Sequence, residues 1–455
     1  MAEPAVIVVG AGPAGTRAAQ RLVAAGLRPI VLDEGERSGG QIYRRQPEGF
    51  TRPPEALYGT EAPKAVALHA AFEALLPRID HRPGTLAFAI SDGAVLAIRQ
   101  GDVVRLPYRA LILTTGATDR IMPVPGWTLP GVFSLGAAQI ALKAQACAIG
   151  QRPVFIGTGP LLYLVAYQYM KAGVAVQAVL DTSRFGLRLR ALPALLARAG
   201  VLAQGLRYTL ALRRAGVKLL TGVVPLGIDG TGRVQSIRFR DGSGRDQEMA
   251  CDAVGMGYGL RSETQLADLA GCRFRFDQVA RQFLPEVDED GRSSVPGVYL
   301  AGDGALVRGA DAAEAAGRLA ALAAMHDLGL HAPGAECRNL RRELAVMSRF
   351  REGLESAFPW PAQLAAGLPD DTLVCRCEAI TAGEIRHAAS ALDAPEVNRA
   401  KAFNRVGMGR CQGRMCGLAG AEVLAAARGV PVAQVGRLRG QAPVKPLPAS
   451  TGLPA

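Results

Sequence analysis

The clearest pattern along the chain is a short uncharged apolar run that leads into glycines and then into a helix. The run Ala5–Val9 (AVIVV) has the composition of a strand buried on both faces of a parallel sheet. A helix is predicted to follow and to stop at Gly26, and a second strand is predicted at residues 28–34. The same strand–glycine–helix pattern returns at residues 153–173 and is followed by the apolar stretch VAVQAVLD. The pattern therefore predicts an α/β fold with two nucleotide-type units.

Length and composition indicate a cytoplasmic protein of several domains. The 455 residues suggest two to four domains at about 150 residues each. The apolar runs are far shorter than the roughly 20 residues of a membrane-spanning helix, and no basic region precedes the first one, so we expect neither a transmembrane segment nor a secretory signal. The net charge of +12 comes from scattered arginines without a nucleic-acid-binding signature. We therefore expect bound dinucleotides or an acidic protein partner, and no nucleic acid.

The first glycine-rich turn has the residues that a dinucleotide requires. Its glycines supply a tight turn, close backbone approach to a pyrophosphate and close helix–strand packing, and the amides of the next helix face the phosphates. An acid at the end of the second strand accepts hydrogen bonds from the adenosine ribose; Asp33 and Glu34 compete for this role, and we favour Glu34. The candidate residues of the turn are Gly10, Gly12, Pro13, Ala14 and Gly15.

Three further stretches resemble the two-dinucleotide-domain flavoprotein reductases, where they contact FAD. Glu34 is followed by GERSGGQIYR, which is similar to the E-x4-GGQ loop that lies along FAD in that family. Residues 109–120 read as a buried strand that ends in Thr-Thr-Gly, like the family's ATG loop, and residues 296–305 match its second FAD signature. In the family, the aspartate of this signature binds the ribityl and phosphate region, and the next helix offsets charge on the reduced flavin. The resemblance implies FAD and adds the candidates Gly40, Gln41, Thr115, Gly116, Gly302 and Asp303.

The second strand–glycine–helix unit departs from its pattern. In the resembling family this half binds NAD(P)H, which would here involve Gly157, Gly159 and Asp181. The third glycine position is Leu162, whose large side chain would push the helix away from the turn. We expect the fold to survive and nicotinamide binding to be lost; NAD(P), a mononucleotide such as ATP, and an empty structural repeat all stay open. No cysteine pair stands beside either nucleotide motif, unlike in the thiol-disulfide members of the family.

Four of the eight cysteines form a separate cluster near the end of the chain. They lie in two short loops, each before a predicted helix, and the first helix has Thr381 as its N-cap and Glu384 at the capping-box position. Four thiolates fit a [2Fe–2S] cluster or a tetrahedral Zn²⁺, and the Cys-x-Cys spacing favours iron–sulfur. The segment resembles bacterioferritin-associated ferredoxin, which usually has two residues between its last cysteines where this chain has four. The candidate ligands are Cys375, Cys377, Cys411 and Cys416.

The order of the motifs resembles one group of proteins. VIVVGAGPAG, GGQIYR, LTTGATDR, VGMGYGLRSETQLADLAGC, GVYLAGDGA and the two cysteine loops are similar to the flavoprotein alpha (A) subunits of opine oxidases, D-hydroxyproline dehydrogenases and hydrogen cyanide synthase, over about residues 4–430. The resemblance implies that a separate beta subunit, similar to D-amino-acid oxidase, oxidises the substrate and passes electrons to FAD and the cluster of this chain. It also implies a small [2Fe–2S] gamma subunit in some complexes, FMN as a cofactor at a subunit interface, and a quinone-linked chain at the membrane surface.

We therefore predict a two-dinucleotide-binding-domain flavoprotein, similar to glutathione and thioredoxin reductases, with a small helical [2Fe–2S] domain. The expected parts are an FAD domain (1–120 and 280–335), an inserted nucleotide-fold domain (121–279), a helical linker (336–370), the cluster domain (371–430) and a flexible tail (431–455). None of the five histidines stands in a reactive context, so we expect no catalytic residue on this chain. The alternatives are a stand-alone NAD(P)H-dependent flavin and iron–sulfur reductase and a non-catalytic scaffold that holds zinc.

Overall fold

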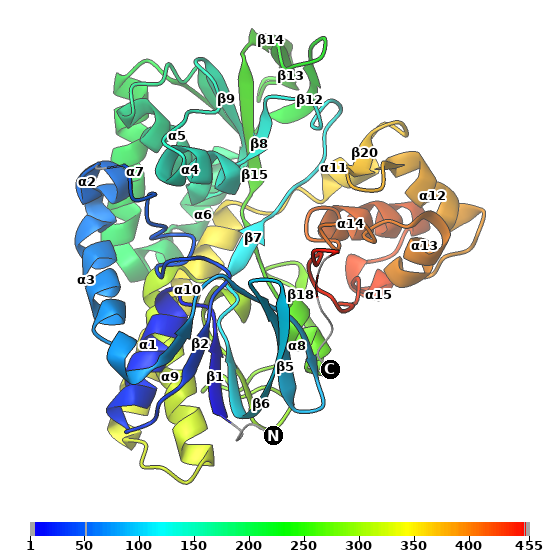
Figure 1. Cartoon of the computed structure of the whole chain (residues 1–455). Coiled ribbons are helices and arrows are strands. Elements are labelled where there is room, and N and C mark those ends of the chain that lie inside the picture. The colour runs from blue at the N-terminus through cyan, green and yellow to red at the C-terminus, as the bar shows by residue number, and fades with distance from the viewer. Residues whose placement is uncertain (1–4, 51, 450, 452–455) are drawn as a thin grey trace.

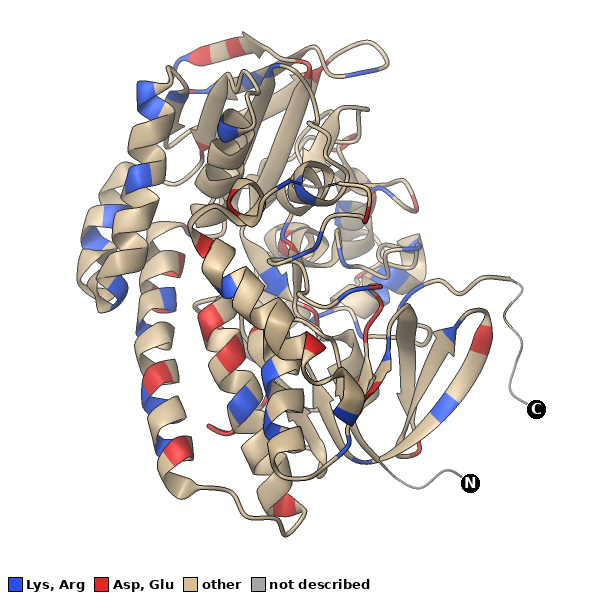
Figure 2. Cartoon of the chain, turned by 60° about the vertical axis from the view of Figure 1, so that its left-hand side comes forward, with Lys and Arg blue, Asp and Glu red and all other residues tan. Residues whose placement is uncertain are grey.

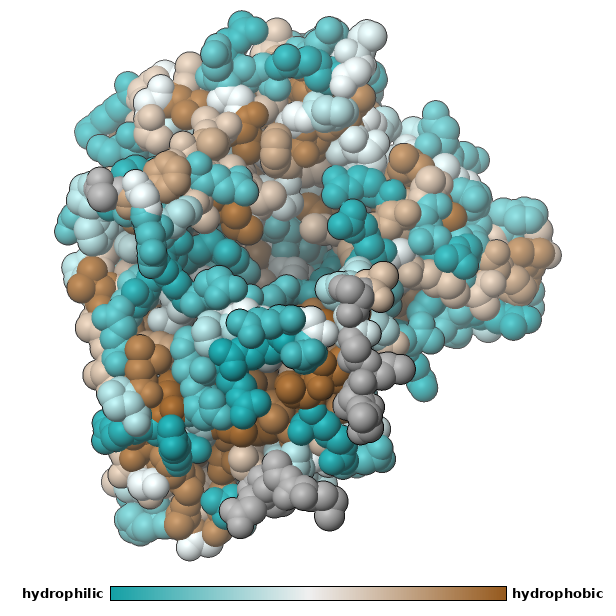
Figure 3. Space-filling model, in the orientation of Figure 1, coloured by the Kyte–Doolittle hydropathy of each residue, from teal (hydrophilic) through white to brown (hydrophobic). Residues whose placement is uncertain are grey.

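Two nucleotide-binding folds form the body of the molecule, and a small C-terminal domain projects from its side (Figures 1 and 3). The computed structural model describes residues 5–50, 52–449 and 451. No helix in these ranges is both long enough and apolar enough to cross a membrane. The predicted α/β class with a small helical C-terminal domain is confirmed.

The first domain is built on a mixed seven-stranded sheet in the order β3-β2-β1-β6-β5-β4, with β19 also paired to β6. Strand β6 is long because residues 102–107 pair antiparallel with β5, whereas residues 110–113 pair parallel with β1. The predicted glycine turn thus leaves the parallel half of the sheet. The strands are β1 (Ala5–Val9), β2 (Ile30–Leu32), β3 (Asp80–Arg82), β4 (Thr85–Ser91), β5 (Ala94–Arg99), β6 (Asp102–Leu113) and β19 (Val298–Leu300).

Helices α1 (Pro13–Ala24) and α9 (Ala310–Asp327) pack on the first sheet and against each other. They approach closely because Gly317 has no side chain: a Cβ there would lie 2.1 Å from the carbonyl oxygen of Ala14. Helices α2 (Pro54–Tyr58) and α3 (Ala62–Glu73) cover the outer side, as Figure 1 shows. This packing fixes the start of α1, and with it the first glycine turn.

The second domain contains a five-stranded parallel sheet in the order β11-β10-β9-β15-β8 and a three-stranded antiparallel sheet, β12-β13-β14. Strands β7 (Ala117–Asp119) and β16 (Leu260–Ser262) pair where the chain enters and leaves this domain. The other strands of this domain are β8 (Val132–Ser134), β9 (Pro153–Thr158), β10 (Ala178–Asp181), β11 (Lys218–Thr221), β12 (Val224–Asp229), β13 (Ser236–Arg240), β14 (Asp246–Ala250) and β15 (Ala253–Tyr258). After the chain leaves the second domain, β17 (Phe274–Asp277) and β18 (Gln282–Pro285) pair beside the first domain. The helices of the second domain are α4 (Leu135–Ala144), α5 (Pro160–Lys171), α6 (Phe185–Leu195) and α7 (Ala199–Arg214), whereas α8 (Gln265–Leu269) packs on the core of the first domain.

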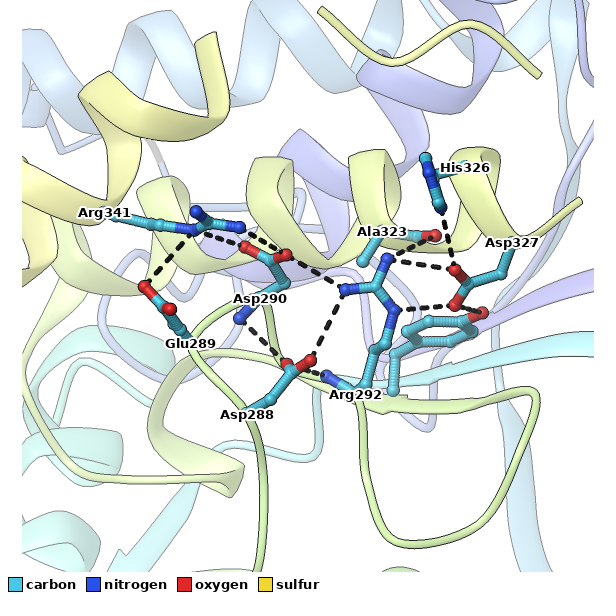
Figure 4. A network of polar contacts seen from close by, with 9 residues as sticks. Asp288, Glu289, Asp290, Arg292, Ala323, His326, Asp327 and Arg341 are labelled. Carbon is cyan, nitrogen blue, oxygen red and sulfur yellow. Dashed lines mark hydrogen bonds and ion pairs between the residues drawn. The ribbon is translucent and has the colours of Figure 1, made fainter. Parts of the chain in front are cut away.

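Helix α10 (Gly334–Ala357) corresponds to most of the predicted linker, but it is packed against both domains. On the side of the second domain, Gly353 lets the backbone of Leu195 in α6 come close, since a Cβ would lie 3.0 Å from its nitrogen. On the side of the first domain, Arg341 pairs with Asp290 at 2.7 Å. Figure 4 shows this pair within a network in which Arg292 also reaches Asp290. The helix therefore braces the two domains.

The C-terminal domain is small, helical and joined to the second domain by a continuous apolar core. Two hydrogen bonds support this contact. The indole N–H of Trp127 donates to the carbonyl oxygen of Leu373 at 2.6 Å, and that of Trp360 donates to the carboxylate of Glu422 at 3.0 Å. Its elements are α11 (Gln363–Ala366), β20 (Leu373–Cys375), β21 (Ile380–Thr381), α12 (Ala382–Ser390), α13 (Val397–Asn404), α14 (Gly417–Arg428) and α15 (Val432–Val435). The capping box predicted at the start of α12 is present.

Residues 431–449 correct the prediction of a flexible tail. After α15 the chain runs back to the first domain, where Val444 is buried in the apolar core and its N–H donates to the carbonyl of Phe88 at 2.9 Å. On the way, Arg437 forms an ion pair with Asp268 at 2.6 Å. Composition predicted disorder because the segment is rich in proline, but a few buried contacts are enough to order it. Residues 450 and 452–455 of the predicted tail lie outside the described residues.

Candidate redox site

The first glycine turn is as tight as its sequence predicts. Gly10 has φ +108°, and a Cβ on it would lie 2.6 Å from the carbonyl oxygen of Thr114. A Cβ on Gly15 would lie 1.8 Å from the carbonyl oxygen of Gly10, so only glycine allows α1 to begin this close to the turn. A Cβ on Gly12 would be in ordinary van der Waals contact with the Cα of Gly40, at 3.5 Å. The GGQ loop therefore lies against the turn.

The two candidate acids at the end of β2 have different environments. Asp33 is largely enclosed: one carboxylate oxygen accepts a hydrogen bond from the N–H of Ala11, the other from the N–H of Gly35 at 2.6 Å. Burial raises the pKa of Asp33. Glu34 is exposed and forms an ion pair with Lys445 of the C-terminal segment. Asp33 is thus the acid that reaches the glycine turn, whereas the sequence favoured Glu34.

Asp303, of the second signature, lies directly after β19 in a short turn of helix. Its carboxylate accepts hydrogen bonds from the backbone N–H groups of Arg308 at 2.9 Å and Gly309 at 3.1 Å. Burial raises the pKa of this carboxyl group. Gly302 has φ +67°, and a Cβ there would lie 2.9 Å from the Cβ of Ala14 in α1. The two signatures therefore come together at the start of α1, although almost 300 residues separate them.

The Thr-Thr-Gly loop after β6 contacts a residue that the sequence analysis did not select. The hydroxyl of Thr115 donates to the carbonyl oxygen of Glu263 at 2.5 Å, and the N–H of Glu263 donates to the carbonyl oxygen of Gly116 at 3.0 Å. The carboxylate of Glu263 in turn pairs with Arg414 at 2.6 Å. Arg414 lies between Cys411 and Cys416, so Glu263 directly joins the predicted flavin loop to the predicted cluster loop.

Two more side chains next to Glu263 hold the same cysteine loop. Arg261 donates to the carbonyl oxygens of Gly413 and Arg414, both at 3.3 Å, and Gln265 donates to that of Gln412 at 2.6 Å. Both are largely enclosed. The stretch that holds these residues, VGMGYGLRSETQLADL, is part of the family resemblance but contains no recognisable nucleotide or metal motif. Their role depends on a contact across about 150 residues of sequence, and no local pattern could have revealed it.

The four predicted ligands lie close together in pairs: Cys411 is within hydrogen-bonding reach of Cys377 and Cys416, and Cys416 also of Cys375. Among the described residues, however, no group of three or more is arranged to hold a metal ion. Cys375 ends β20, Cys377 follows in the next turn, and Cys411 and Cys416 lie in the loop that leads into α14. The thiol of Cys416 hydrogen-bonds to the sulfurs of Cys375 and Cys411, which lowers the pKa of Cys375 to about 6 and that of Cys411 to about 5. Backbone N–H groups donate to both sulfurs as well. The environment therefore favours the thiolate, the form that binds a metal, at Cys375 and Cys411. Burial raises the pKa of Cys377, and the hydrogen bonds to the other two sulfurs raise the pKa of Cys416.

The long gap between the last two cysteines is accommodated by a compact loop. Gln412 and Gly413 both have positive φ, +51° and +76°, so the chain folds back on itself between Cys411 and Cys416. Gly409 brings the second loop against the first, because a Cβ there would lie 2.3 Å from the Cβ of Cys377. The two extra residues thus form part of the turn and do not separate the sulfurs.

The second nucleotide unit has the predicted backbone but a closed surface. Leu162 is fully buried in the core between α5 and the sheet. Asp181, at the ribose-binding position, is also fully buried and accepts hydrogen bonds from the hydroxyl of Tyr163 at 2.9 Å and the N–H of Ser183 at 2.8 Å. Arg188 pairs with the same carboxylate at 2.6 Å. Every contact that a ribose hydroxyl would make with Asp181 is therefore taken by the protein itself.

The chain matches two families of known proteins. Residues 4–320 match the pyridine nucleotide-disulphide oxidoreductases, and residues 373–426 match the BFD-like [2Fe-2S] binding domains. The chain is 40% identical to the A subunit of opine oxidase from Agrobacterium tumefaciens, over 97% of this chain and 90% of that protein, and 39% identical to the corresponding protein from Rhizobium meliloti, over 97% and 86%. The chain belongs to the family of opine oxidase A subunits.

Two further relatives extend the comparison. This family member is 31% identical to hydrogen cyanide synthase subunit HcnB of Pseudomonas aeruginosa, over 98% of this chain and 97% of that protein. The crystal structure of L-proline dehydrogenase from P. horikoshii has the same fold, with a TM-score of 0.70 at 19% identity, over 98% of this chain and 79% of that one. The predicted family, fold class and oxidoreductase activity are confirmed.

The two family matches make this chain a flavin-dependent oxidoreductase with FAD and a [2Fe–2S] cluster. The residues fit both groups: no side chain caps the N-terminal N–H groups of α1 at the first turn, and of the four neighbouring cysteines two have a pKa lowered by hydrogen bonds. One buried group near the flavin loop was not foreseen. Lys143 of α4 donates to the carbonyl oxygen of Ile42 at 3.4 Å, and burial lowers its pKa to about 8.

Proposed function

We propose that this chain is the electron-transfer component, the alpha-type subunit, of a heteromeric amine or imino-acid dehydrogenase of the opine oxidase or D-hydroxyproline dehydrogenase type. A separate flavoprotein subunit, similar to D-amino-acid oxidase, removes hydride from the substrate, and this chain receives the electrons. A small [2Fe–2S] gamma subunit completes some complexes of this kind. The proposed location is the cytoplasm, with a quinone-linked chain at the membrane surface as the final acceptor.

The observation that carries the proposal is the bridge between the flavin loop and the cluster loop. Thr115 and Glu263 are hydrogen-bonded at 2.5 Å, and Glu263 and Arg414 are paired at 2.6 Å. When bound, FAD exchanges two electrons and a [2Fe–2S] cluster carries one at a time. The chain itself fixes the two loops relative to each other, and Arg261 and Arg414 offset the negative charge of four thiolates. This arrangement favours electron relay over chemistry on a substrate.

The closed second nucleotide unit supports the same assignment. Because Tyr163 and Arg188 occupy the carboxylate of Asp181, a dinucleotide has no free acid for its ribose. We therefore propose that NAD(P)H is not the electron donor. At the first unit we propose that backbone amides of residues 10–15 hold the pyrophosphate and that Asp33 holds the ribose. Asp303 would contact the ribityl and phosphate region of the flavin.

Replacing a cluster ligand tests the proposed cofactor arrangement. We expect Cys411→Ser to abolish the visible and electron paramagnetic resonance signals of the cluster and to leave FAD bound, because the flavin residues belong to another domain. Wild-type protein purified without oxygen should contain two irons and two sulfides per chain, as a [2Fe–2S] cluster requires. The matched control is Cys147→Ser, which removes an exposed thiol and should change neither cofactor. Loss of FAD together with the cluster in C411S would contradict independent sites.

Electron donors distinguish the proposed function from a stand-alone reductase. We expect NADH and NADPH, added without oxygen, to leave the flavin absorbance of the isolated chain unchanged. D-hydroxyproline or an opine should bleach it only when an oxidase-like flavoprotein subunit is present. Bleaching of the isolated chain by NADH would identify a self-contained reductase. Zinc in place of iron would leave a structural role for the four cysteines.

A further inference from the structure

One stretch of the second domain has no acidic residue for more than 40 positions. Between Asp181 and Asp229 the chain contains eight arginines and lysines and neither aspartate nor glutamate. We call residues 184–218 of this stretch, which include α6 and α7, the basic helical segment. Figure 2 shows the contrast, because α10 carries both signs of charge whereas α6 and α7 carry basic residues alone.

The same segment exposes an unusual amount of apolar side chain. Of the seventeen large hydrophobic side chains that are exposed in the described ranges, seven lie between residues 185 and 210. Helix α7 has sixteen residues, yet Leu212 is its one buried side chain. A helix in a soluble domain normally buries an apolar stripe along its length, so α7 lacks a partner for much of its surface. The exposed residues are Phe185, Leu189, Leu192, Leu196, Val201, Leu206 and Leu210.

The exposed apolar residues follow helical spacing. Along α6 and the short 3-10 helix that continues it (Leu196–Arg198), they stand at positions 185, 189, 192 and 196, which places them on one face. Along α7, Leu206 and Leu210 continue a face that Ala199 and Ala203 begin. Leu206, Leu189 and Leu196 are 63%, 60% and 56% exposed. Each helix therefore presents a continuous apolar stripe to the outside.

Most of the positive charges of the segment also lack partners. Arg188 pairs with Asp181, and Arg198 pairs with Asp311. The other six are exposed and form no ion pair with any described residue. Unpaired cations beside an apolar stripe are the features of a helix that lies in the interface of an anionic membrane. The six residues are Arg184, Arg190, Arg207, Arg213, Arg214 and Lys218.

The inner side of the segment is firmly attached to the protein. The ring of Tyr208 in α7 stacks on that of Tyr167 in α5, with 4.5 Å between their centres. Leu195 of α6 is buried against Phe350 of α10. The exposed stripes are therefore held on a fixed support and do not belong to a loosely attached arm.

We propose that the basic helical segment docks this protein on the surface of an anionic phospholipid membrane. The leucines would enter the boundary between headgroups and acyl chains, and the six unpaired cations would contact phosphate groups. A protein partner is less well supported, because cores of protein interfaces are depleted of charge and rich in aromatic side chains, whereas Phe185 is the one aromatic residue among the seven exposed apolar side chains here and the surface is uniformly basic. The inference concerns a binding surface and does not depend on the electron donor.

Flotation with lipid vesicles tests this proposal on the full FAD-loaded chain. We expect the protein to float with vesicles of equal parts phosphatidylglycerol and phosphatidylcholine, and to stay behind with phosphatidylcholine alone. Raised salt should weaken the charged contribution. Each of two combined variants should lower the partition coefficient at least about tenfold. The first combines Leu189→Ser, Leu196→Ser, Leu206→Ser and Leu210→Ser; the second combines Arg190→Gln, Arg207→Gln, Arg213→Gln and Arg214→Gln.

A matched control separates this surface from the overall charge of the protein. The exposed face of α10 carries cations and a valine without ion pairs among the described residues, and their replacement should leave flotation within about twofold of wild type. An equal loss in the control, or no flotation of the wild type, would overturn the proposal. So would leucine variants that keep vesicle binding but lose an oxidase-like subunit or a second copy of the chain. The control combines Arg338→Gln, Arg342→Gln, Arg349→Gln and Val346→Ser.

Discussion

The first and second nucleotide folds each join a buried strand to a helix through a glycine-rich turn, but the surroundings of the two turns differ. In the first, Gly15 lets the helix start against the turn, and Asp33 contacts only backbone N–H groups of the nearby loops. In the second, Leu162 fills the core and Asp181 is enclosed by Tyr163 and Arg188. The backbone pattern thus specifies a fold, whereas the neighbouring side chains decide whether a ligand can use it.

This difference suggests how one chain can contain two nucleotide folds and yet bind a dinucleotide at the first of them alone. The second unit still supplies a sheet, the core that anchors the C-terminal domain, and the strand pair that ends near Glu263. Its value to the molecule is structural, because it positions the cluster domain against the flavin loop. The following predictions test this division, from the largest expected effect to the smallest.

Exchanging the third position of the two turns should have opposite results. Gly15→Leu should abolish FAD binding, because even a Cβ would lie 1.8 Å from the carbonyl oxygen of Gly10. Leu162→Gly should destabilise the second domain by roughly 2–5 kcal/mol through the cavity that it leaves, without creating NADH binding. Flavin content and NADH titration measure both outcomes. NADH binding by L162G would show that one leucine, and not the enclosed acid, closes the second site.

Breaking the ion pair between Arg188 and Asp181 in the second domain should lower the stability of the protein and leave its FAD content unchanged. Arg188→Met leaves the fully buried carboxylate of Asp181 without its cation, which should lower the free energy of unfolding by about 3 kcal/mol. Urea denaturation followed by fluorescence of Trp127 and Trp360 reports this change, since both lie in the core shared with the second domain. Arg190→Met is the control, as this exposed arginine forms no ion pair there. Loss of FAD in R188M alone would indicate that the two units are coupled.

The two acids after β2 offer a closely matched comparison. Asp33→Asn should weaken FAD binding by about 1–3 kcal/mol, because a buried charged acceptor at the turn is removed. Glu34→Gln should change the affinity by less than about 1 kcal/mol, since it breaks only an exposed pair with Lys445. Fluorescence titration of the apoprotein with FAD measures both. A larger loss of FAD affinity in Glu34→Gln than in Asp33→Asn would support the sequence-based choice of Glu34.

The smallest effect concerns the network around Arg292 in the first domain (Figure 4). Its hydrogen bonds lower the pKa of Asp327 to about 2, below the ordinary value of 3.8. The unfolded chain therefore binds more protons than the folded one between these values. The stabilisation is complete above about pH 4 and is lost as the pH falls towards 2. Thermal unfolding between pH 5 and 2 should depend less steeply on pH in Asp327→Asn than in wild type; equal slopes would contradict the assignment.

Local sequence patterns were enough to predict much of this molecule. Both glycine turns, their strands and helices, and the capping box at Thr381 depend on short-range chemistry, because a tight turn needs glycine and an N-cap needs a side-chain acceptor. The four cysteines were found for the same reason, since two short loops each carry two of them. The family resemblance added the two cofactors, which the matches to known families bear out.

Only the tertiary structure decided what surrounds these motifs. Glu263 pairs with Arg414, and Val444 is buried in the core of the first domain, although the residues in contact are far apart in the sequence. Asp181 is fully buried, which depends on the direction in which its side chain points. Composition predicted a flexible tail where the structure has a packed segment, and the helix predicted within the linker also contacts both domains. A sequence records which side chains are available along each element, but the packing of whole elements decides which of them meet, because burial and hydrogen bonding depend on the complete set of neighbours.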